Sequence, residues 1–277
     1  MSKDDIKIVI TDLDGTLLNN YKQVSLIDMK SLYWLGEREI IRVIATGRNF
    51  YSACKSISDK FPIDYLIFSS GAGIYNWKQK KLIHSQYLPE NEVKQISQIL
   101  TDHEIDFMIH EMVPENHKFI YHRTKKINPD FERRIEIYKE FADELDKTKE
   151  TYEHASQILA VFPNDIELFK EIENKFNDIK IIRTTSPLDG DSIWMEIFPI
   201  SVSKGHGIEW LCNKLKINQS QTISIGNDYN DIDMLEYTAK KYVVLNAPDD
   251  LKERFPVCNS NQENGFTSAL DLYFELF

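Results

Sequence analysis

Apolar positions in the first 75 residues fall into short runs of strand length that alternate with amphipathic segments. The runs are Ile6–Ile10, Ile40–Ala45 and Asp64–Ser69, and all are rich in β-branched or large apolar residues. Between them, Ser25–Gly36 and Asn49–Lys60 have the length and pattern of helices. Strands that alternate with helices at this spacing are typical of a parallel, doubly wound sheet. The pattern therefore predicts an α/β fold here.

The pattern changes near residue 80, where helical segments and strand pairs follow one another without βαβ alternation. The segment Pro129–Leu145 is dense in Glu, Arg and Lys, and it predicts a helix with a solvated face. Lys180–Thr184 and Trp194–Phe198 predict a β-hairpin across Pro187–Gly190. Helices and hairpins in this mixture are typical of an α+β unit.

The α/β alternation returns after about residue 200, where a strand over Thr222–Ile225 precedes a helix over Ile232–Tyr237. We therefore predict a discontinuous Rossmann-like core, residues 1–80 and 190–277. A smaller α+β domain, residues 81–189, is inserted into it. Such insertions are tolerated at exposed loops because the ends of a domain lie close together.

Composition limits the classes of protein that need consideration. The chain has 277 residues, of which 42% are hydrophobic and 28% are charged, as in ordinary globular proteins. It has no apolar run near the roughly 20 residues that span a bilayer, and its first residues do not resemble a signal segment. We therefore expect a cytoplasmic protein without a membrane partner, either a monomer or a small homo-oligomer.

The charged residues give a formal net charge of −11, from 33 basic and 44 acidic side chains. An acidic surface repels nucleic acid and anionic lipid, so a nucleic-acid partner is not expected. Any phosphate-binding site must be locally positive. The three cysteines show no CxxC spacing, which predicts buried thiols. The histidines show no metal-ligand spacing, and His103, His110, His117 and His122 are expected on the surface of the inserted domain.

Candidate chemistry begins directly after the first strand, at Asp12-Leu13-Asp14-Gly15-Thr16. Alternate residues of a strand face one side, so Asp12 and Asp14 can point together if the strand continues. Two carboxylates this close repel one another unless a cation lies between them, which indicates Mg²⁺. An Asp-Gly hairpin turn is the alternative. No second alternating strand follows Thr16, which favours the site.

Three further segments place polar residues just behind predicted core strands. These are Thr46-Gly47-Arg48, then Lys204 at the start of a helix, and the loop Gly226-Asn227-Asp228-Tyr229-Asn230-Asp231. The carboxyl ends of parallel strands meet at one edge of a sheet. All four segments can therefore share one crevice, where open α/β sheets bind their ligands.

In this order, the four segments resemble the four motifs of the haloacid dehalogenase superfamily of phosphotransferases. The inserted middle segment and the context Ser203-Lys204-Gly205 look like the Cof-type branch, a group of phosphatases whose cap domain lies between the second and third motifs. The resemblance covers nearly the whole chain. It implies an α/β core with an α+β cap.

The resemblance also implies the roles of individual residues. Asp12 would be the nucleophile that forms an aspartyl-phosphate, and Asp14 would protonate the leaving alcohol and then activate water. Thr46 would donate its hydroxyl to the phosphate, and Lys204 would offset the charge on Asp12. Mg²⁺ would join Asp12 to a phosphate oxygen. The expected substrate-binding residues are Thr46, Gly47, Arg48, Ser70, Lys204 and Asn230. The expected metal-binding residues are Asp12, Asp14, Asn227, Asp228 and Asp231.

The fourth motif departs from the family pattern, which usually has Asp directly after the glycine. This chain has Asn227 there and Asp228 next. An amide oxygen can ligate Mg²⁺, but more weakly than a carboxylate. The negative charge of its carboxylate favours Asp228 as the ligand. The register of the loop relative to the first motif favours Asn227. Asp231 would support the metal shell or orient Lys204.

Two other residues have alternative interpretations. Arg48 either contacts the substrate or pairs with an acid. Ser70 replaces an asparagine common in related proteins, and it either contacts the substrate or only forms a tight turn.

The sequence thus predicts a Mg²⁺-dependent phosphatase for a small phosphorylated metabolite, such as a sugar phosphate. A phosphomutase would use the same aspartyl-phosphate. A metabolite-binding regulatory protein with a weakened core is the alternative from another class. The presence of Asp12, Asp14, Thr46 and Lys204 counts against it, and Asn227 counts slightly for it.

Overall fold

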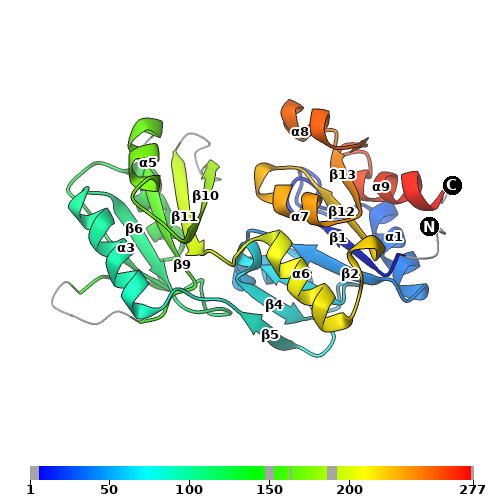
Figure 1. Cartoon of the computed structure of the whole chain (residues 1–277), viewed down its shortest axis with the longest axis horizontal. Helices are drawn as coiled ribbons and strands as arrows, with labels where there is room; N and C mark the ends of the chain where they lie inside the picture. The colour runs from blue at the N-terminus through cyan, green and yellow to red at the C-terminus, as the bar shows by residue number, and fades with distance from the viewer. Residues whose placement is uncertain (1–5, 147–152, 163, 186–191, 276–277) are drawn as a thin grey trace. The chain divides into compact units, whose positions relative to one another are not determined.

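The chain forms two compact units, each with its own sheet (Figure 1). The computed structural model describes residues 6–146, 153–162, 164–185 and 192–275. The first unit comprises residues 1–48, 52–85 and 203–277, and the second comprises residues 49–51 and 86–202. The sequence places the second boundary at 190. In the structure, residues 193–199 belong to the second unit because they pair with strands on both sides there.

The first unit contains an eight-stranded sheet with the order β14-β13-β12-β1-β2-β3-β4-β5. The first six of these strands run parallel, and β4 and β5 add an antiparallel hairpin at one edge. The strands are β1 (Ile8–Thr11), β2 (Ile41–Ala45), β3 (Tyr65–Phe68), β4 (Gly73–Asn76), β5 (Lys81–Ser85), β12 (Thr222–Gly226), β13 (Lys240–Val244) and β14 (Val257–Cys258). The sequence did not indicate β4, β5 or β14.

Helices flank this sheet as the βαβ pattern requires. They are α1 (Leu26–Glu37), α2 (Phe50–Ser56), α6 (Lys204–Leu215), α7 (Ile232–Tyr237), α8 (Asp249–Arg254) and α9 (Gly265–Phe274). From β1 the chain steps to β2 in one direction, and from β12 it steps to β13 in the other. Right-handed crossovers therefore place α1 and α7 on opposite faces. This confirms the predicted doubly wound α/β core.

The second unit contains a six-stranded sheet with the order β10-β11-β9-β6-β7-β8, in which only β7 and β8 run parallel. Its strands are β6 (Asp106–His110), β7 (Phe119–His122), β8 (Ala142–Glu144), β9 (Gln157–Phe162), β10 (Ile179–Thr185) and β11 (Ile193–Pro199). Its helices are α3 (Glu90–Asp102), α4 (Pro129–Ile137) and α5 (Ile166–Glu173). Apolar residues of α3 and α5 pack on one face, and Phe131 of α4 packs on the other.

Two expectations for the second unit are wrong. The helix expected over 129–145 ends at Ile137, and β8 follows it, because Ala142–Glu144 pairs with β7. His110, His117 and His122 are buried, because each ring packs against aromatic neighbours. The β10–β11 hairpin is confirmed, although its expected turn, Pro187–Gly190, lies outside the described residues.

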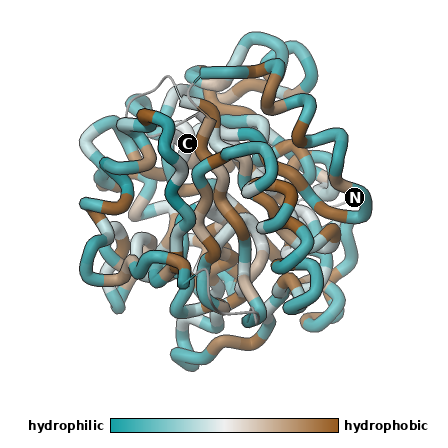
Figure 2. The backbone as a smooth tube through the Cα atoms, turned by 90° about the vertical axis from the view of Figure 1, so that its left-hand side faces the viewer, coloured by the Kyte–Doolittle hydropathy of each residue, from teal (hydrophilic) through white to brown (hydrophobic). Residues whose placement is uncertain are grey.

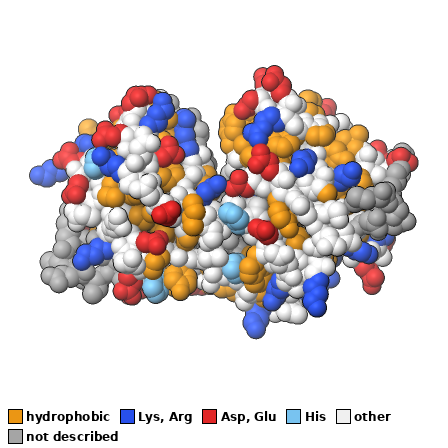
Figure 3. Space-filling view, in the orientation of Figure 1, with side chains coloured by type: hydrophobic (Ala, Val, Ile, Leu, Met, Phe, Trp, Pro, Cys, Tyr) orange, Lys and Arg blue, Asp and Glu red, His pale blue; other side chains and the backbone are white. Residues whose placement is uncertain are grey.

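Hydropathy follows the architecture of each unit. In Figure 2 the strands at the centre of the view are largely hydrophobic, whereas most of the connecting loops are hydrophilic. Acidic and basic side chains are interspersed over the surface seen in Figure 3. Within the described part of the chain, no helix has both the length and the apolar character needed to cross a bilayer.

Candidate active site

The motif residues gather where β1 and β12 end side by side. The main-chain N–H of Asp12 donates to the carbonyl of Ile225 (2.9 Å), which continues the β1–β12 pairing to the first motif. From this point the two strands lead to helices on opposite faces, which is the position where open α/β sheets bind their ligands. All the predicted site residues belong to the first unit.

A buried lysine joins two of the predicted carboxylates. Lys204 is the first residue of α6, and its Nζ lies 2.7 Å from Oδ1 of Asp12 and 2.5 Å from Oδ1 of Asp231. The exposed fractions of Lys204 and Asp231 are 1% and 0%. The other oxygen of Asp231 accepts the N–H groups of Asn227 (2.8 Å) and Asp228 (3.1 Å). Asp231 therefore fixes the loop and orients Lys204.

Glycine is required at the start of this loop. A methyl group on Gly226 would lie 2.7 Å from the Asp231 carboxylate, so a larger residue would displace Asp231. The segment 226–231 thus folds so that the Asp231 carboxylate turns back toward the end of β12.

The charges of this cluster depend on one another. The pKa of Asp12 is raised to about 7, mainly by burial, which outweighs the opposing effect of Lys204 and is assisted by the neighbouring Asp231. Burial acts to lower the pKa of Lys204, but the two carboxylates outweigh it and hold that pKa above its ordinary value. Lys204 is therefore a fixed cation beside Asp12.

Asp14 points away from this cluster and is held by two cations. Arg48 donates from Nε and Nη2 to the two carboxylate oxygens of Asp14, each at 2.6 Å, and Lys22 Nζ lies 3.1 Å from Oδ1. Burial alone would raise the pKa of Asp14. The hydrogen bonds and charges of Arg48 and Lys22 outweigh burial and hold that pKa below its ordinary value. Of the two interpretations of Arg48, the structure shows pairing with an acid.

The second motif lies beside the cluster at the end of β2. Thr46 is buried, and its hydroxyl accepts the N–H of Arg48 (3.1 Å), which leaves the hydroxyl proton available for donation. Gly47 has room for a methyl group on its α-carbon. A methyl group there would lie 3.6 Å from both Ser70 Oγ and Asn230 Nδ2. Four of the predicted substrate-binding residues are therefore neighbours.

Ser70 has a left-handed backbone, with φ +54° and ψ +20°, and Ser69 before it has φ +48°. Non-glycine residues rarely adopt this region, and each such residue costs on the order of 1 kcal/mol. The N–H of Ser70 donates to the carbonyl of Thr46 (3.1 Å). This bond holds the Ser70 turn against the second motif.

The two candidate metal ligands of the fourth motif, Asp228 and Asn227, differ in position. Asp228 is exposed, and its carboxylate accepts the N–H of Tyr229 (2.7 Å) at the start of a short 3₁₀ helix. Asn227 turns inward, where its side-chain oxygen lies 3.0 Å from Thr16 Oγ1. Within the described ranges, no three His, Cys, Asp or Glu side chains converge as a metal site.

Two residues of this site received no role from the sequence. Thr16 belongs to the first motif, and in the structure it is fully buried and its hydroxyl donates to Asn227. Lys22 reaches Asp14 from a loop in which Asn19 accepts the N–H groups of Tyr21 and Gln23. The Asn19 side chain and the positive φ of Lys22 (+59°) define this loop, and neither contact can be read from spacing alone.

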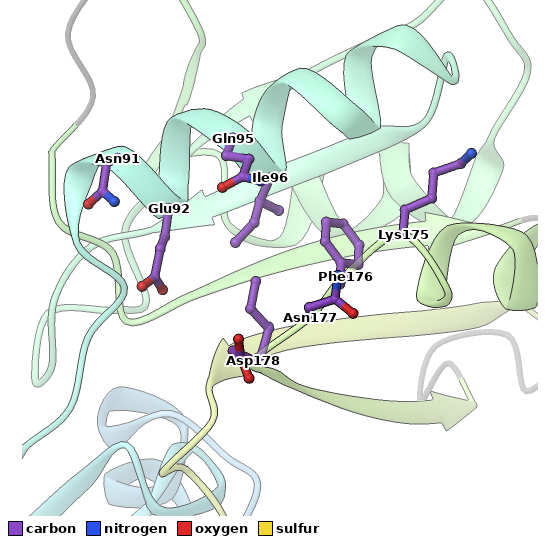
Figure 4. A pocket seen from close by; sticks show the side chains of 9 residues that line it. Asn91, Glu92, Gln95, Ile96, Lys175, Phe176, Asn177 and Asp178 are labelled. Atoms are coloured by element: carbon purple, nitrogen blue, oxygen red, sulfur yellow. The ribbon is translucent and has the colours of Figure 1, made fainter.

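A cavity of about 260 Å³ lies elsewhere, within the second unit. Figure 4 shows its lining side chains, which come from the start of α3 and from the segment that leads into β10. None of the predicted site residues lines it. The candidate chemistry therefore remains at the strand ends of the first unit.

Comparison with known proteins supports the resemblance. The family model described as haloacid dehalogenase-like hydrolase matches residues 9–270. The chain belongs to this family. The match confirms the family predicted from the four motifs.

Among the relatives of this hydrolase is the 5-amino-6-(5-phospho-D-ribitylamino)uracil phosphatase YwtE of Bacillus subtilis. It is 25% identical over 96% of this chain and 97% of its own length. Another phosphatase of that organism with the same name, YcsE, is 23% identical over 96% of this chain and 95% of its own length. These names agree with the predicted enzyme class, a phosphoric monoester hydrolase.

Solved structures show the same fold. BT1666 of Bacteroides thetaiotaomicron, described among the phosphatases of the superfamily, superposes with a TM-score of 0.79 at 20% identity, over 97% of this chain and 95% of that one. The subclass IIB sugar phosphatase BT4131 gives a TM-score of 0.73 at 21% identity, over 98% and 100%. The predicted core with its inserted α+β domain is thus a known arrangement for this hydrolase family.

Proposed function

We propose that this hydrolase is a Mg²⁺-dependent phosphatase that cleaves a small phosphorylated metabolite through an aspartyl-phosphate on Asp12. The observation that carries this proposal is the buried pair of Asp12 and Lys204, 2.7 Å apart at the end of β1. A carboxylate held beside a fixed cation can attack phosphorus while the charge of the phosphoryl oxygens is offset.

Asp14 is proposed as the group that moves the proton. Phosphoryl transfer needs an acid for the leaving alcohol and then a base for water. Asp14 lies two residues from Asp12, and its side chain is 35% exposed. Arg48 and Lys22 orient its carboxylate, and they favour the ionised form that would activate water.

The phosphate is proposed to bind between Thr46, Gly47, Ser70, Asn230 and Lys204. The hydroxyl of Thr46 has a proton to donate, and Lys204 provides the charge. Gly47 is exposed and has no side chain, so a phosphoryl oxygen can approach its backbone on the side that Ser70 Oγ and Asn230 Nδ2 border. These are the donors that a tetrahedral dianion requires.

The residues at the strand end fit a magnesium ion. Oδ2 of Asp12, the carbonyl oxygen of Asp14 and the amide of Asn227 converge, with separations of 3.0 and 3.1 Å from the amide terminus. Adjacent oxygens of an octahedral Mg²⁺ site are about 3.0 Å apart, since each lies roughly 2.1 Å from the ion. We therefore assign these three groups as the protein ligands, with Asn227 in place of Asp228. When bound, Mg²⁺ would neutralise phosphate charge beside Asp12.

Local charge also indicates that a divalent cation is needed. Three cations of the site face three carboxylates: Lys22, Arg48 and Lys204 against Asp12, Asp14 and Asp231. A phosphate monoester adds about two negative charges at neutral pH. The site has no surplus positive charge to offset them, so a bound cation would supply it.

The substrate class is proposed from the relatives. YwtE is named for a phosphorylated ribityl compound, and BT4131 is described as a sugar phosphatase. Both names concern small phosphorylated carbohydrate derivatives. We propose a sugar phosphate or related monoester as the substrate of this chain.

A panel of phosphorylated metabolites tests this function directly. Phosphate release is measured with Mg²⁺, with EDTA, and for the variant Asp12→Asn. The proposal predicts release by the wild type with Mg²⁺ only, and a loss of at least about 10³-fold in the variant. Full activity of Asp12→Asn would contradict it. Isomerised phosphate esters without release of phosphate would show a phosphomutase instead.

A further inference from the structure

The side-chain amide of Asn227 lies among groups that are nearly all hydrogen-bond acceptors. Thr16 Oγ1, the carbonyl oxygen of Asp14 and Oδ2 of Asp12 lie within 3.0–3.1 Å of the inward end of this amide. While Asp12 is ionised in its pair with Lys204, only the hydroxyl of Thr16 has a proton to offer. Thr16 and Asp12 are buried, with exposed fractions of 0% and 5%, so water does not separate these groups.

The amide can face this cluster in two ways. With its oxygen inward, it accepts from Thr16 Oγ1 (3.0 Å), but it also faces the oxygens of Asp14 and Asp12 with no proton between them. With its nitrogen inward, the two amide protons reach the carbonyl of Asp14 (3.0 Å) and Oδ2 of Asp12 (3.1 Å). Unpaired buried acceptors are costly, so without a cation the nitrogen faces inward.

A bound cation reverses this preference. A magnesium ion requires oxygen ligands and repels the amide protons. The oxygen-inward orientation then places three oxygens at the separations expected for neighbouring ligands of an octahedral ion.

We infer that Asn227 is a two-position switch whose nitrogen replaces the cation between Asp12 and Asp14 in the metal-free enzyme, and whose oxygen ligates Mg²⁺ in the metal-bound enzyme. This inference rests on the metal site of the proposed function. It explains what asparagine provides here that aspartate does not. An aspartate would offer a third oxygen and no proton, so the metal-free site would contain two facing carboxylates.

An asparagine in place of an aspartate at position 227 also affects the affinity for Mg²⁺. With Asn227, Asp12 is the one charged ligand among the three, and its other oxygen is already paired with Lys204 (2.7 Å). Affinity for hard cations rises with the charge of the ligand set. Magnesium must also displace the amide protons before it binds. Both effects predict weak Mg²⁺ binding and a metal-free protein that remains stable.

The variant Asn227→Asp tests the inference, with Asp228→Asn as the matched control. Asp228 is the exposed neighbouring residue and does not turn inward. Mg²⁺ alone is titrated into metal-free protein by calorimetry, and thermal melting is recorded in EDTA and across Mg²⁺ concentrations. We expect Asn227→Asp to bind Mg²⁺ at least about tenfold more tightly than the wild type. We also expect its Tm in EDTA to be lower. Asp228→Asn should bind within about twofold of the wild type.

Several outcomes would overturn the inference. These are an unchanged Mg²⁺ affinity in Asn227→Asp, a Tm in EDTA equal to that of the wild type, or a tenfold loss of affinity in Asp228→Asn. If Asn227→Asp does not fold without metal, nuclear magnetic resonance of the wild-type protein tests the switch instead. The side-chain amide of Asn227, identified by its absence in Asn227→Ser, should exchange slowly in EDTA and should shift and exchange faster with Mg²⁺. No change at saturating Mg²⁺ would contradict the switch.

These measurements contain no phosphorylated compound. A protein that binds Mg²⁺ as described but hydrolyses nothing in the panel would contradict the proposed function and leave the switch intact. An active phosphatase with a Mg²⁺-insensitive Asn227 amide would contradict only the switch.

Discussion

At the residue scale, Lys204 has two roles that experiments can separate. Its ammonium lies 2.7 Å from Asp12 and 2.5 Å from Asp231, and all three side chains are almost completely buried. One role is to compensate two buried carboxylates, and the other is to offset charge at the phosphate. Removal of one partner from a buried ion pair leaves uncompensated charge, which is costly.

We therefore expect Lys204→Met to lower the free energy of unfolding by about 3–5 kcal/mol. Denaturant unfolding measures this effect. The double variant Lys204→Met/Asp231→Asn should recover part of the stability, because one of the two carboxylates is gone, but none of the phosphatase activity. Lys214→Met is the control, since Lys214 is exposed on the same helix. A Lys204→Met protein as stable as this control would contradict the account.

Arg48 is expected to affect only the proton-transfer part of the reaction. It holds both oxygens of Asp14 at 2.6 Å, so Arg48→Gln should leave the Asp14 carboxylate held only by Lys22 and less well oriented. We expect kcat/KM, which covers the steps up to release of the alcohol, to fall about 10–100-fold for an alkyl phosphate, whose leaving group needs a proton. It should fall less than about threefold for p-nitrophenyl phosphate, whose leaving group does not.

Lys22→Gln provides the comparison for Arg48. Lys22 is 63% exposed and makes one contact with Asp14, so its loss should have a smaller effect in the same direction. Steady-state kinetics on both substrates measure the difference. Equal losses on both substrates in Arg48→Gln would show that Arg48 acts on phosphate binding instead.

Much of the site could be predicted at this scale, because the first, second and fourth motifs follow β1, β2 and β12, which end at one edge of the sheet. The expected core strand before Lys204 is wrong, because the preceding strand, β11, belongs to the second sheet. Asp12, Lys204 and Asp231 nevertheless meet. The pairing of Arg48 with Asp14 was one of two open alternatives, since one motif does not reveal which partner a flexible guanidinium selects. The choice between Asn227 and Asp228 needed the loop conformation, in which Asp228 caps a 3₁₀ turn.

At the scale of elements, the turn after β3 links the second motif to the start of α6. Gly71 has φ +108°, and a methyl group there would overlap the carbonyl oxygen of Ser203, the residue before Lys204. Glycine is therefore the residue that lets this turn lie against the helix that carries the lysine.

We expect Gly71→Ala to lower the free energy of unfolding by about 3 kcal/mol, from strain at positive φ and from overlap with backbone. Gly47→Ala is the matched control. Its methyl group would meet only ordinary contacts at 3.6 Å, so stability should change by less than about 1 kcal/mol. Because that methyl group would project toward the proposed phosphate position, KM should rise while stability is kept. If the two variants were equally stable, the role assigned to Gly71 would be wrong.

The elements themselves were predicted best where a strong local signal exists. Ser25 caps α1 by accepting the N–H of Asp28 (3.0 Å), as its position before an amphipathic segment predicts. The helix expected over 129–145 was wrong after Ile137. Charged residues suit an exposed helix and an edge strand alike, and pairing with β7 decides the outcome for Ala142–Glu144.

At the scale of the whole molecule, stability toward acid is expected to depend on the second unit. Burial lowers the pKa of His110 to about 3, aided by the charge of Arg134. In the unfolded chain the pKa is near 6.5. Between these values the unfolded chain binds a proton that the folded chain does not, so stability is complete above pH 6.5 and falls as the pH decreases toward 3.

At pH 5 this linkage amounts to about 2 kcal/mol. We expect His110→Gln to lose less stability than the wild type when the pH falls from 8 to 4.5. His103→Gln is the control and should show no such gain in acid stability, since the ring of His103 is partly exposed. Thermal melting from pH 8 to pH 4.5 measures the difference. Parallel pH profiles for the wild type and His110→Gln would contradict this prediction.

The most direct test of the central claim is detection of the phosphoryl group on Asp12. The enzyme is mixed with a ³²P-labelled substrate and Mg²⁺, quenched in acid within one turnover, and examined for protein-bound label. The account predicts label that hydroxylamine removes, carried by a peptide containing Asp12 and absent from Asp12→Asn. Phosphate release at the wild-type rate by Asp12→Asn, or label on another residue, would contradict it.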